Sequence, residues 1–263
     1  MMKKKKRVSI IPLHGQIFSS ESRKGGIYPD QVRIYFEEAI QHKSELVVLD
    51  INSPGGSPVG STMIHNMILS LRETGIKVIA HCRDVCASGG YLIVSACDEI
   101  HAYKSSMIGS IGVIMSGFGF QDALKHHHVE YRELTAGENK APVSPFKALD
   151  EDGKQFIEGM LADVHEDFID IVYKSRPNEK MIENKTMITT AKVFTGKKAH
   201  EIGMIDGFKT IKLILEDLFG KDTKLKIHRP KAKESFIKKL ISGHFAVEFS
   251  LKPFQLDQKI ELK

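Results

Sequence analysis

Short apolar runs alternate with stretches of helical periodicity along most of the chain. The runs at 8–13, 45–51, 77–82 and 98–103 are predicted to be strands, and their apolar character on both faces is typical of a parallel sheet covered by helices. A predicted helix lies between each pair of neighbours among the first three runs. Apolar residues recur at helical spacing in the first helix at Val32, Phe36, Ala39 and Ile40, and in the second at Met63, Met67, Leu69 and Leu71. Ser61 or Thr62 lies near the start of the second helix. Strand and helix in alternation predict an α/β fold with its functional loops at the strand carboxyl ends.

A longer helical stretch is predicted at about 149–175. One apolar stripe runs along it, formed by Phe156, Met160, Leu161, Val164, Phe168, Ile169 and Val172. The stripe fits either the domain core or a subunit contact, and we expect core for most of its positions. The segment 189–209 then predicts a strand, a short helix after Thr195 and Gly196, and a turn at Asp206 and Gly207.

Charge divides the chain into three parts. Residues 1–7 form a basic extension, residues 8–220 form an acidic body, and residues 221–263 form a basic tail, for a net charge of +5. Within the tail we expect a linker at 221–234 and a basic amphipathic helix at 235–249, which would lie on a membrane surface or dock on a neighbouring subunit. Basic ends favour contact with an anionic membrane. No nucleic-acid-binding motif is present, so no nucleic-acid partner is expected.

Composition is that of a soluble globular protein, with 41% hydrophobic and 27% charged residues. No run reaches the roughly 18 apolar residues of a membrane-spanning helix. Pro12 and His14 interrupt the apolar segment after the basic start, which favours a strand over a signal peptide. We therefore expect the protein in the cytoplasm or peripherally associated with a membrane.

The three cysteines predict small buried thiols in a reducing compartment. Cys82, Cys86 and Cys97 are an odd number in a long chain, and a second pair that would complete a zinc site is missing. No metal and no other cofactor are expected.

Two glycine-rich loops follow consecutive predicted strands. The first reads NSPGG (52–56), and the second, ASGGY (87–91), sets two glycines directly behind Ser88. Glycines let backbone N–H groups approach a ligand, and two such groups aimed at one point form an oxyanion hole. The glycine spacings of phosphate-binding loops are absent. Ser88 is therefore a candidate nucleophile, and a plain Ser-Gly turn is the alternative.

A nucleophilic serine needs a base, and no histidine follows Ser88 closely. A lysine can serve when burial or nearby charge lowers its pKa. Lys140 stands in LTAGENKAPVSPFKA (134–148), where Pro142 and Pro145 exclude a helix interior or a central strand. An irregular loop therefore displays this lysine, but the residues alone leave it one candidate among many lysines.

Five segments in order resemble the signal peptide peptidase A family, including its SohB-type members, over roughly residues 8–212. They are NSPGG (52–56), ASGGY (87–91), GSIGVIM (109–115), TAGENKAPVSPF (135–146) and VFTGKKAHEIGMID (193–206). The resemblance implies a serine peptidase with a Ser-Lys dyad. It also implies a Clp-protease/crotonase-like fold, a spiral of repeated β-β-α or βαβ units with a parallel sheet, followed by a long helical C-terminal segment.

The resemblance also implies residue roles and partners. Ser88 would be the nucleophile and Lys140 the general base, with Ser110 orienting the lysine amine. The N–H groups of Gly56 and Gly89 would form the oxyanion hole. The implied partners are a peptide substrate, signal-peptide-like or otherwise apolar, and further copies of the chain, because family members assemble into rings or domes.

Two other functions fit the same fold. A crotonase-type acyl-CoA enzyme also uses paired backbone N–H groups, but it typically sets carboxylates near the thioester, where these loops offer a serine. A non-catalytic assembly protein would have no need of the intact set of Ser88, Lys140 and Ser110. We therefore predict a peptidase.

Overall fold

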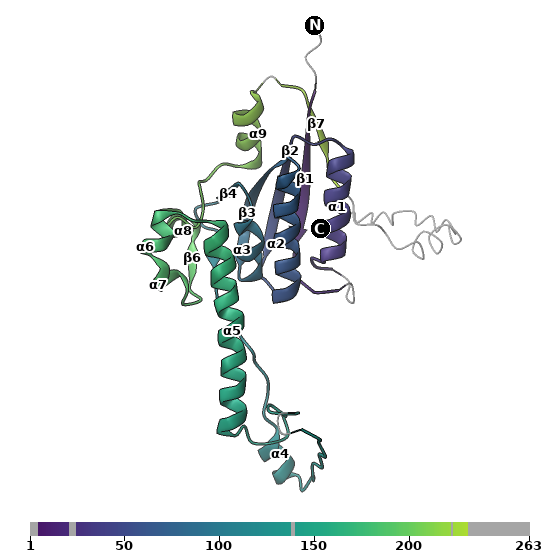
Figure 1. Cartoon of the computed structure of the whole chain (residues 1–263), viewed down its shortest axis with the longest axis vertical. Coiled ribbons are helices and arrows are strands. Elements are labelled where there is room, and N and C mark those ends of the chain that lie inside the picture. Colours follow the sequence, from purple (N-terminus) through teal and green to yellow (C-terminus); the bar gives the residue numbers. More distant parts are fainter. Residues whose placement is uncertain (1–4, 21–24, 138–139, 222, 231–263) are drawn as a thin grey trace, which may run out of the picture. The chain divides into compact units, whose positions relative to one another are not determined.

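The computed structural model describes residues 5–20, 25–137, 140–221 and 223–230 (Figure 1). Its sheet has the strand order β6-β5-β3-β2-β1-β7, with β4 also paired to β3. The strands are β1 (Lys6–His14), β2 (Leu46–Ser53), β3 (Lys77–Ala87), β4 (Glu99–Ala102), β5 (Met107–Gly109), β6 (Val193–Thr195) and β7 (Leu225–His228). Every pairing is parallel except that of β5 with β6. The predicted α/β class with a parallel sheet is confirmed.

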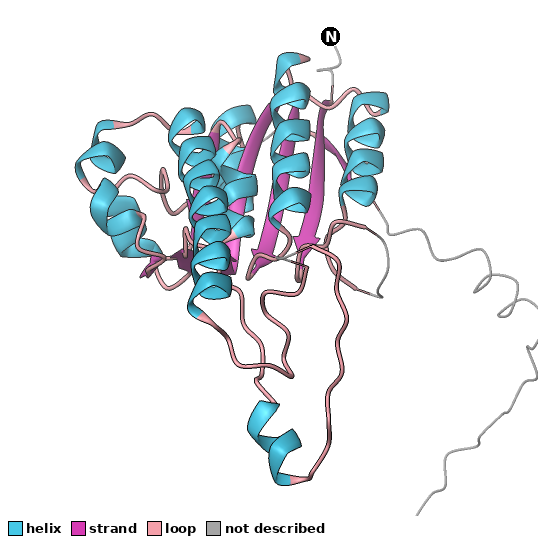
Figure 2. Ribbon diagram, turned by 60° about the horizontal axis from the view of Figure 1, so that its bottom comes forward, coloured by secondary structure: helices cyan, strands magenta, loops and turns pink. Residues whose placement is uncertain are grey.

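Helices cover the sheet on both faces, as the apolar strands predicted. The described helices are α1 (Pro29–Gln41), α2 (Pro58–Glu73), α3 (Gly89–Ser95), α4 (Gln121–His126), α5 (Glu151–Ser175), α6 (Glu179–Glu183), α7 (Lys185–Ile188), α8 (Gly196–Glu201) and α9 (Ile211–Phe219). Helices α1, α2 and α3 pack on one face over the larger core, and α9 contributes Ile214 and Leu215 to a smaller core on the other (Figure 2). None of the described helices is long and apolar enough to cross a bilayer.

Helix α2 begins one turn earlier than the sequence indicated. Ser57 is its N-cap, because its Oγ accepts a hydrogen bond from the Gly60 N–H at 3.1 Å, and Pro58 occupies the first helical position. Ser61 and Thr62, which the sequence placed near the start, lie inside the helix, where their hydroxyls donate to backbone carbonyls one turn back. This earlier start brings the N-terminus of α2 directly behind the first glycine-rich loop.

Helix α5 belongs to the core only at its C-terminal end. Of the predicted stripe, Phe168 and Val172 are buried, whereas Phe156 and Met160 are exposed. The expectation of core for most of the stripe is therefore wrong. The reason is visible in Figure 1, where the N-terminal half of α5 extends beyond the sheet and lies near α4. We call residues 111–160, which include α4 and the first turns of α5, the arm.

Strand β7 lies in a segment that the sequence indicated as a linker. It pairs in parallel with β1, with Lys6 opposite Leu225 and Ser9 opposite His228. This pairing supplies hydrogen-bond partners to a β1 edge that would otherwise be open. The predicted amphipathic helix at 235–249 lies outside the described residues, and the three-part division of the chain stays a prediction.

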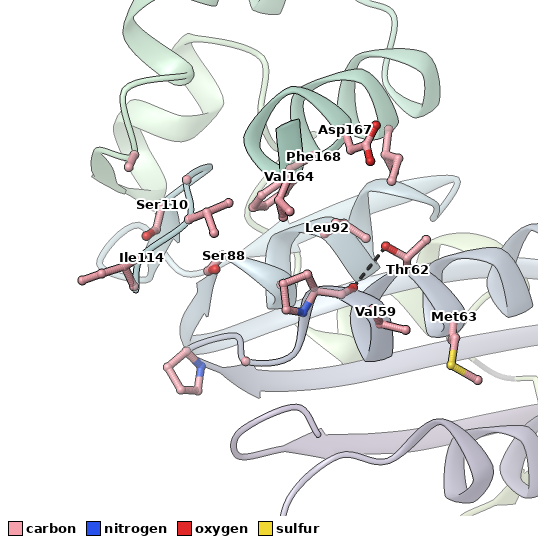
Figure 3. Close-up of a pocket in the computed structure, with 18 of the residues that line it drawn as sticks. Val59, Thr62, Met63, Ser88, Leu92, Ser110, Ile114, Val164, Asp167 and Phe168 are labelled. Carbon is pink, nitrogen blue, oxygen red and sulfur yellow. Dashed lines mark hydrogen bonds between the residues drawn. The ribbon is translucent and has the colours of Figure 1, made fainter. Parts of the chain in front are cut away.

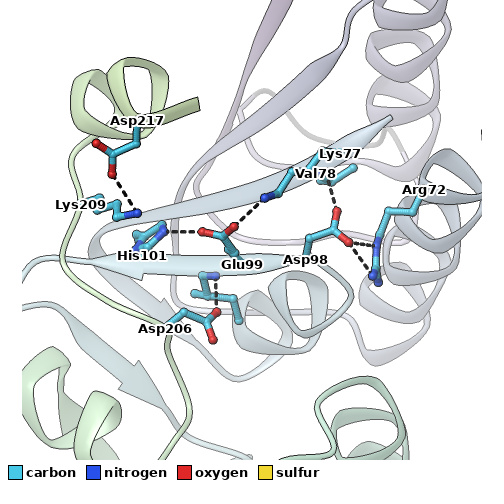
Figure 4. A network of polar contacts seen from close by, with 10 residues as sticks. Arg72, Lys77, Val78, Asp98, Glu99, His101, Asp206, Lys209 and Asp217 are labelled. Carbon is cyan, nitrogen blue, oxygen red and sulfur yellow. Dashed lines mark hydrogen bonds and ion pairs between the residues drawn. The ribbon is translucent and has the colours of Figure 1, made fainter. Parts of the chain in front are cut away.

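Ion pairs tie the ends of several elements together on the side of the sheet away from the glycine-rich loops (Figure 4). Asp98 accepts a hydrogen bond from Arg72 of α2 at 2.8 Å. Asp206 accepts one from the Ile100 N–H at 2.7 Å and pairs with Arg176, 2.8 Å away, whose side chain is only 7% exposed. These contacts hold α2, β4 and the end of α5 against one another.

Candidate active site

Ser88 occupies a sharp turn between β3 and α3. Its backbone has φ 52° and ψ −128°, a left-handed conformation that costs a non-glycine residue free energy. The turn is fixed because the Ser88 N–H donates to the Gly109 carbonyl at 2.7 Å and the Tyr91 N–H donates to the Ser88 carbonyl at 2.9 Å. A strained strand–turn–helix of this kind displays a hydroxyl at the carboxyl edge of a sheet. The Ser-Gly pair is thus a turn, and that turn presents Ser88 to a pocket.

The two glycine-rich loops meet at Ser88. A β-carbon added at Gly55 would lie 2.7 Å from the Ser88 Cβ and 2.9 Å from the Gly89 nitrogen. One added at Gly56 would lie 2.1 Å from the Ile17 carbonyl oxygen. Both positions therefore require glycine for space as well as for their positive φ angles.

The N–H groups of Gly56 and Gly89 are free to bind a ligand. Both residues line the same pocket as Ser88, and neither N–H has an acceptor within the described part of the chain. Gly89 is the first residue of α3, where N–H groups have no partner inside the helix. Unpaired donors beside a nucleophile are what an oxyanion hole requires. Their role in catalysis stays a prediction.

Ser110 lies beside Ser88 at the pocket, as Figure 3 shows. It follows β5 in a left-handed conformation with φ 55°, and its N–H donates to the Lys192 carbonyl at 2.8 Å. The fold therefore brings two serines and two glycine N–H groups to one edge of the sheet. Its predicted task, orienting a lysine amine, is not tested by these contacts.

Lys140 does not reach this pocket within one chain. Its side chain is exposed on the arm and makes no ion pair or hydrogen bond with any described residue, while its backbone N–H donates to the Gly137 carbonyl at 3.3 Å. Pro142 lies against Gly153 in the first turn of α5, whereas Val164 of the same helix lines the pocket. Eleven residues of helix separate these two levels, about 16 Å along the axis. Lys140 is therefore not among the described residues that line the pocket, and its role stays a prediction.

The pocket has a volume of about 660 Å³ and lies between α2 and α5. Its walls are built from residues three and four apart on each helix: Val59, Thr62, Met63 and Asn66 of α2, and Val164, Asp167, Phe168 and Ile171 of α5. Sequence reasoning missed the α5 wall, although the spacing of its four residues indicated a shared face. Two hydrogen bonds hold the walls, one between His65 Nε2 and Ser175 Oγ at 2.8 Å and one from His165 Nε2 to the Ile111 carbonyl at 3.0 Å.

The cysteines near the site are buried thiols, as predicted. Cys82, Cys86 and Cys97 are free and buried. Burial raises the pKa of Cys86, two residues before Ser88, well above the usual range, so its reactive thiolate form is disfavoured. Ser88 therefore stays the candidate nucleophile at this edge.

Comparison with known proteins identifies the relatives of this site. The model of peptidase family S49 matches residues 70–222, which include Ser88, Ser110 and Lys140. The probable protease SohB of Haemophilus influenzae is 31% identical over 194 residues, 73% of this chain and 53% of that protein. The Na(+)/H(+) antiporter NhaA of Brucella abortus is 36% identical over 227 residues, 85% of this chain but 31% of that protein. The chain thus spans about a third to a half of these relatives.

Solved structures share the fold. A membrane-bound stomatin-specific protease in complex with a substrate peptide has a TM-score of 0.53 and 20% identity, covering 91% of this chain and 97% of that one. A serine-to-alanine mutant of that protease gives a TM-score of 0.55 and 18% identity, covering 87% and 99%. This likeness confirms the predicted Clp-protease/crotonase-like fold.

Proposed function

The chain belongs to peptidase family S49, and from this membership we propose that it is a serine peptidase acting through Ser88 and Lys140. One observation carries the proposal: a strained turn presents Ser88 to a pocket beside the unpaired N–H groups of Gly56 and Gly89. The antiporter relative is matched over only 31% of its own length, so antiport activity is not proposed for this chain.

The proposed reaction is acyl transfer to water. The Ser88 hydroxyl attacks the carbonyl carbon of a peptide bond while the neutral amine of Lys140 takes its proton. The N–H groups of Gly56 and Gly89 stabilise the oxyanion, and Ser110 orients the lysine. Lys140 then protonates the leaving amine, which departs as the C–N bond breaks. Water hydrolyses the remaining ester and restores the serine.

We propose that the base comes from a second copy of the chain in a homo-oligomer. Pro142, two residues after Lys140, lies against Gly153. Gly153 is about 16 Å along α5 from Val164 at the pocket, and Lys140 is not among the described residues that line the pocket. The arm that carries it exposes large apolar side chains, with Ile114 86%, Phe118 82% and Leu134 100% exposed. Apolar side chains clustered on one exposed segment are typical of an interaction surface. Contact between copies through the arm would bury them and bring Lys140 to the neighbouring Ser88.

The proposed substrate is a peptide rich in apolar side chains, because most residues that line the pocket are apolar and would contact the hydrocarbon part of whichever side chain enters it. An acyl-CoA reaction is disfavoured, since the loops at this edge offer a serine as nucleophile. Labelling by a fluorophosphonate, which reacts with an activated serine, distinguishes the two. Labelling of the wild type but not of Ser88→Ala is expected for a peptidase.

A mixing experiment tests the dyad and its assembly together. Ser88→Ala and Lys140→Ala should each lower kcat/KM on an apolar peptide by at least about a thousandfold. Unfolding and refolding the two variants together should restore activity, because mixed oligomers combine an intact Ser88 with an intact Lys140 from another copy. Lys212→Ala, an exposed lysine on α9 and outside the arm, is the control and should keep full activity. Undiminished turnover in either single variant would exclude the dyad, and no recovery on mixing would exclude a base from a second copy.

We also propose peripheral contact with anionic membranes. Around β7 the basic residues Lys221, Lys224, Lys226 and Arg229 lie close together in sequence and at one edge of the sheet. Attraction of such a group to anionic lipid is strongest at low salt. Co-sedimentation with phosphatidylserine vesicles that weakens as salt rises is the expected result, and absence of binding at low salt would contradict it.

A further inference from the structure

The pocket beside Ser88 contains a single charged side chain. Of the described residues that line it, most are apolar, and only Asp167 carries a charge. In Figure 3, Val164, Phe168 and Leu92 lie between Ser88 and Asp167, so an apolar surface separates the hydroxyl from the carboxylate. A side chain that enters from Ser88 therefore meets hydrocarbon first and a negative charge beyond it.

Helix α5 sets the depth at which this charge lies. The hydrogen bond from His165 to the Ile111 carbonyl, 3.0 Å long, fixes this turn of the helix beside the residue that follows Ser110. Asp167 comes three residues after Val164, about 4.5 Å further along the axis. Because Val164, Asp167 and Phe168 are three and four residues apart, they share the face that lines the pocket. The stem of a lysine or arginine side chain that packs beside Val164 spans this step to Asp167.

The Asp167 carboxylate has no cationic partner within the described chain. Its neighbour on the next turn, Asp170, pairs with Lys174 at 3.2 Å, but no ion pair or hydrogen bond engages the side chain of Asp167. The facing wall of α2 adds polar but uncharged groups, Thr62 and Asn66. The Thr62 hydroxyl already donates to the Pro58 carbonyl. An unpaired carboxylate at the edge of an apolar pocket is available to a substrate.

We propose that Asp167 makes this peptidase selective for peptides with lysine or arginine at the residue whose side chain enters the pocket. The inference rests on the proposed function, because it assigns a subsite to the same Ser88. The methylenes of the substrate side chain pack on Leu92, Val164 and Phe168, and its cationic end reaches the carboxylate. A glutamate of similar length meets the same carboxylate with like charge and is disfavoured.

Selectivity is measured with peptides that differ at one residue. Lysine, norleucine and glutamate are compared in turn at each position flanking the scissile bond, since norleucine keeps the apolar stem and removes the charge. At one position, wild type should favour lysine over norleucine by about threefold to fivefold in kcat/KM, which is typical of a partly exposed ion pair. Rising salt should lower this ratio.

Substitution of Asp167 tests whether its carboxylate causes the preference for lysine. Asp167→Asn should bring the lysine-to-norleucine ratio to about one, because the amide keeps the shape but loses the charge. Asp163→Asn is the matched control, because Asp163 is exposed on α5 as Asp167 is and lies one turn earlier but does not line the pocket; it should keep the wild-type ratio. Active wild type without any charge preference, or an unchanged ratio in Asp167→Asn, would overturn the inference.

A binding measurement tests the role of Asp167 independently of the proposed peptidase reaction. In Ser88→Ala, the dissociation constant of the lysine peptide should be lower than that of the norleucine peptide by the same factor, measured by fluorescence anisotropy. If wild type cleaves no peptide but this binding preference is found, the catalytic proposal fails and the role of Asp167 stands. Equal binding of the two peptides excludes the role of Asp167, whatever the activity.

Discussion

Gly55 and Ser88, on loops that follow different strands, pack so closely that a β-carbon at position 55 would lie 2.7 Å from the Ser88 Cβ. The backbone of each residue is in a positive-φ conformation, with φ 100° at Gly55 and 52° at Ser88. The first loop thereby braces the turn that displays the hydroxyl. The position of Ser88 depends on the absence of a side chain at Gly55 in the neighbouring loop.

Gly55→Ala should therefore lower activity without removing any catalytic group. The added methyl must push Ser88 aside, and a displacement of about 1 Å at a reacting atom costs on the order of a hundredfold in rate. We expect kcat/KM on an apolar peptide to fall by about that factor. Gly75→Ala is the matched control, because Gly75 also has a positive φ of 85° but has no atom within 4 Å of an added β-carbon. A similar loss of activity in both variants would contradict the steric explanation.

Stability should fall between pH 7.5 and pH 5.5 in part through His65. This histidine is buried in α2, and burial lowers its pKa below the usual value near 6.5. The folded protein therefore keeps His65 neutral, while the unfolded chain takes up a proton as the pH falls through about 6.5. Its contribution to stability is present above that pH and is lost on acidification, by up to about 1.4 kcal/mol per pH unit.

Urea unfolding of wild type and His65→Gln at several pH values measures this contribution. The variant cannot take up the proton, so its free energy of unfolding should fall less steeply below pH 6.5 than that of wild type. His126→Gln, an exposed histidine on α4, should leave the wild-type slope unchanged. Parallel curves for wild type and His65→Gln would show that this residue does not titrate differently on folding.

Asp206→Ala should destabilise the fold more than a typical ion-pair substitution. The Arg176 guanidinium is buried, and Asp206 is its carboxylate partner at 2.8 Å, so the variant leaves a buried charge unpaired. It also removes the acceptor of the Ile100 N–H. We expect a loss of about 3 kcal/mol or more in urea unfolding. Asp170→Ala, which breaks the exposed pair with Lys174, should cost less than about 0.5 kcal/mol, and equal losses would contradict the role of burial.

The exposed apolar residues of the arm should control assembly. Replacing Phe118 and Leu134 by glutamine removes two of the most exposed apolar side chains and should lower the mass measured by light scattering toward that of one chain. Peptidase activity should fall with it, because the proposed dyad combines residues of two copies. Leu213→Gln, an exposed leucine on α9, should change neither. Full activity in a monomeric double variant would refute the proposed assembly.

The local pattern of the chain was sufficient to predict the elements nearest the site. Apolar runs located β1 to β4, and the position of two glycine-rich loops after consecutive parallel strands predicted that they meet at one edge. The apolar pattern predicted burial wrongly where a helix has no element of the described chain packed against its apolar face. Phe156 and Met160 repeat at core spacing on α5, yet this part of the helix lies beyond the sheet.

The sequence by itself determined the α/β class, the nucleophile candidate Ser88 and the glycines beside it, because these depend on short-range spacing and on backbone conformations that few residues adopt. Only the tertiary structure decided that Asp167 lines the pocket and that Lys140 lies away from it. Both depend on where a 25-residue helix, α5, meets the sheet, and that level is set by long-range contacts such as His65 with Ser175. The periodicity of a sequence predicts which residues lie on the same face of a helix, but only tertiary packing decides which part of the protein that face contacts.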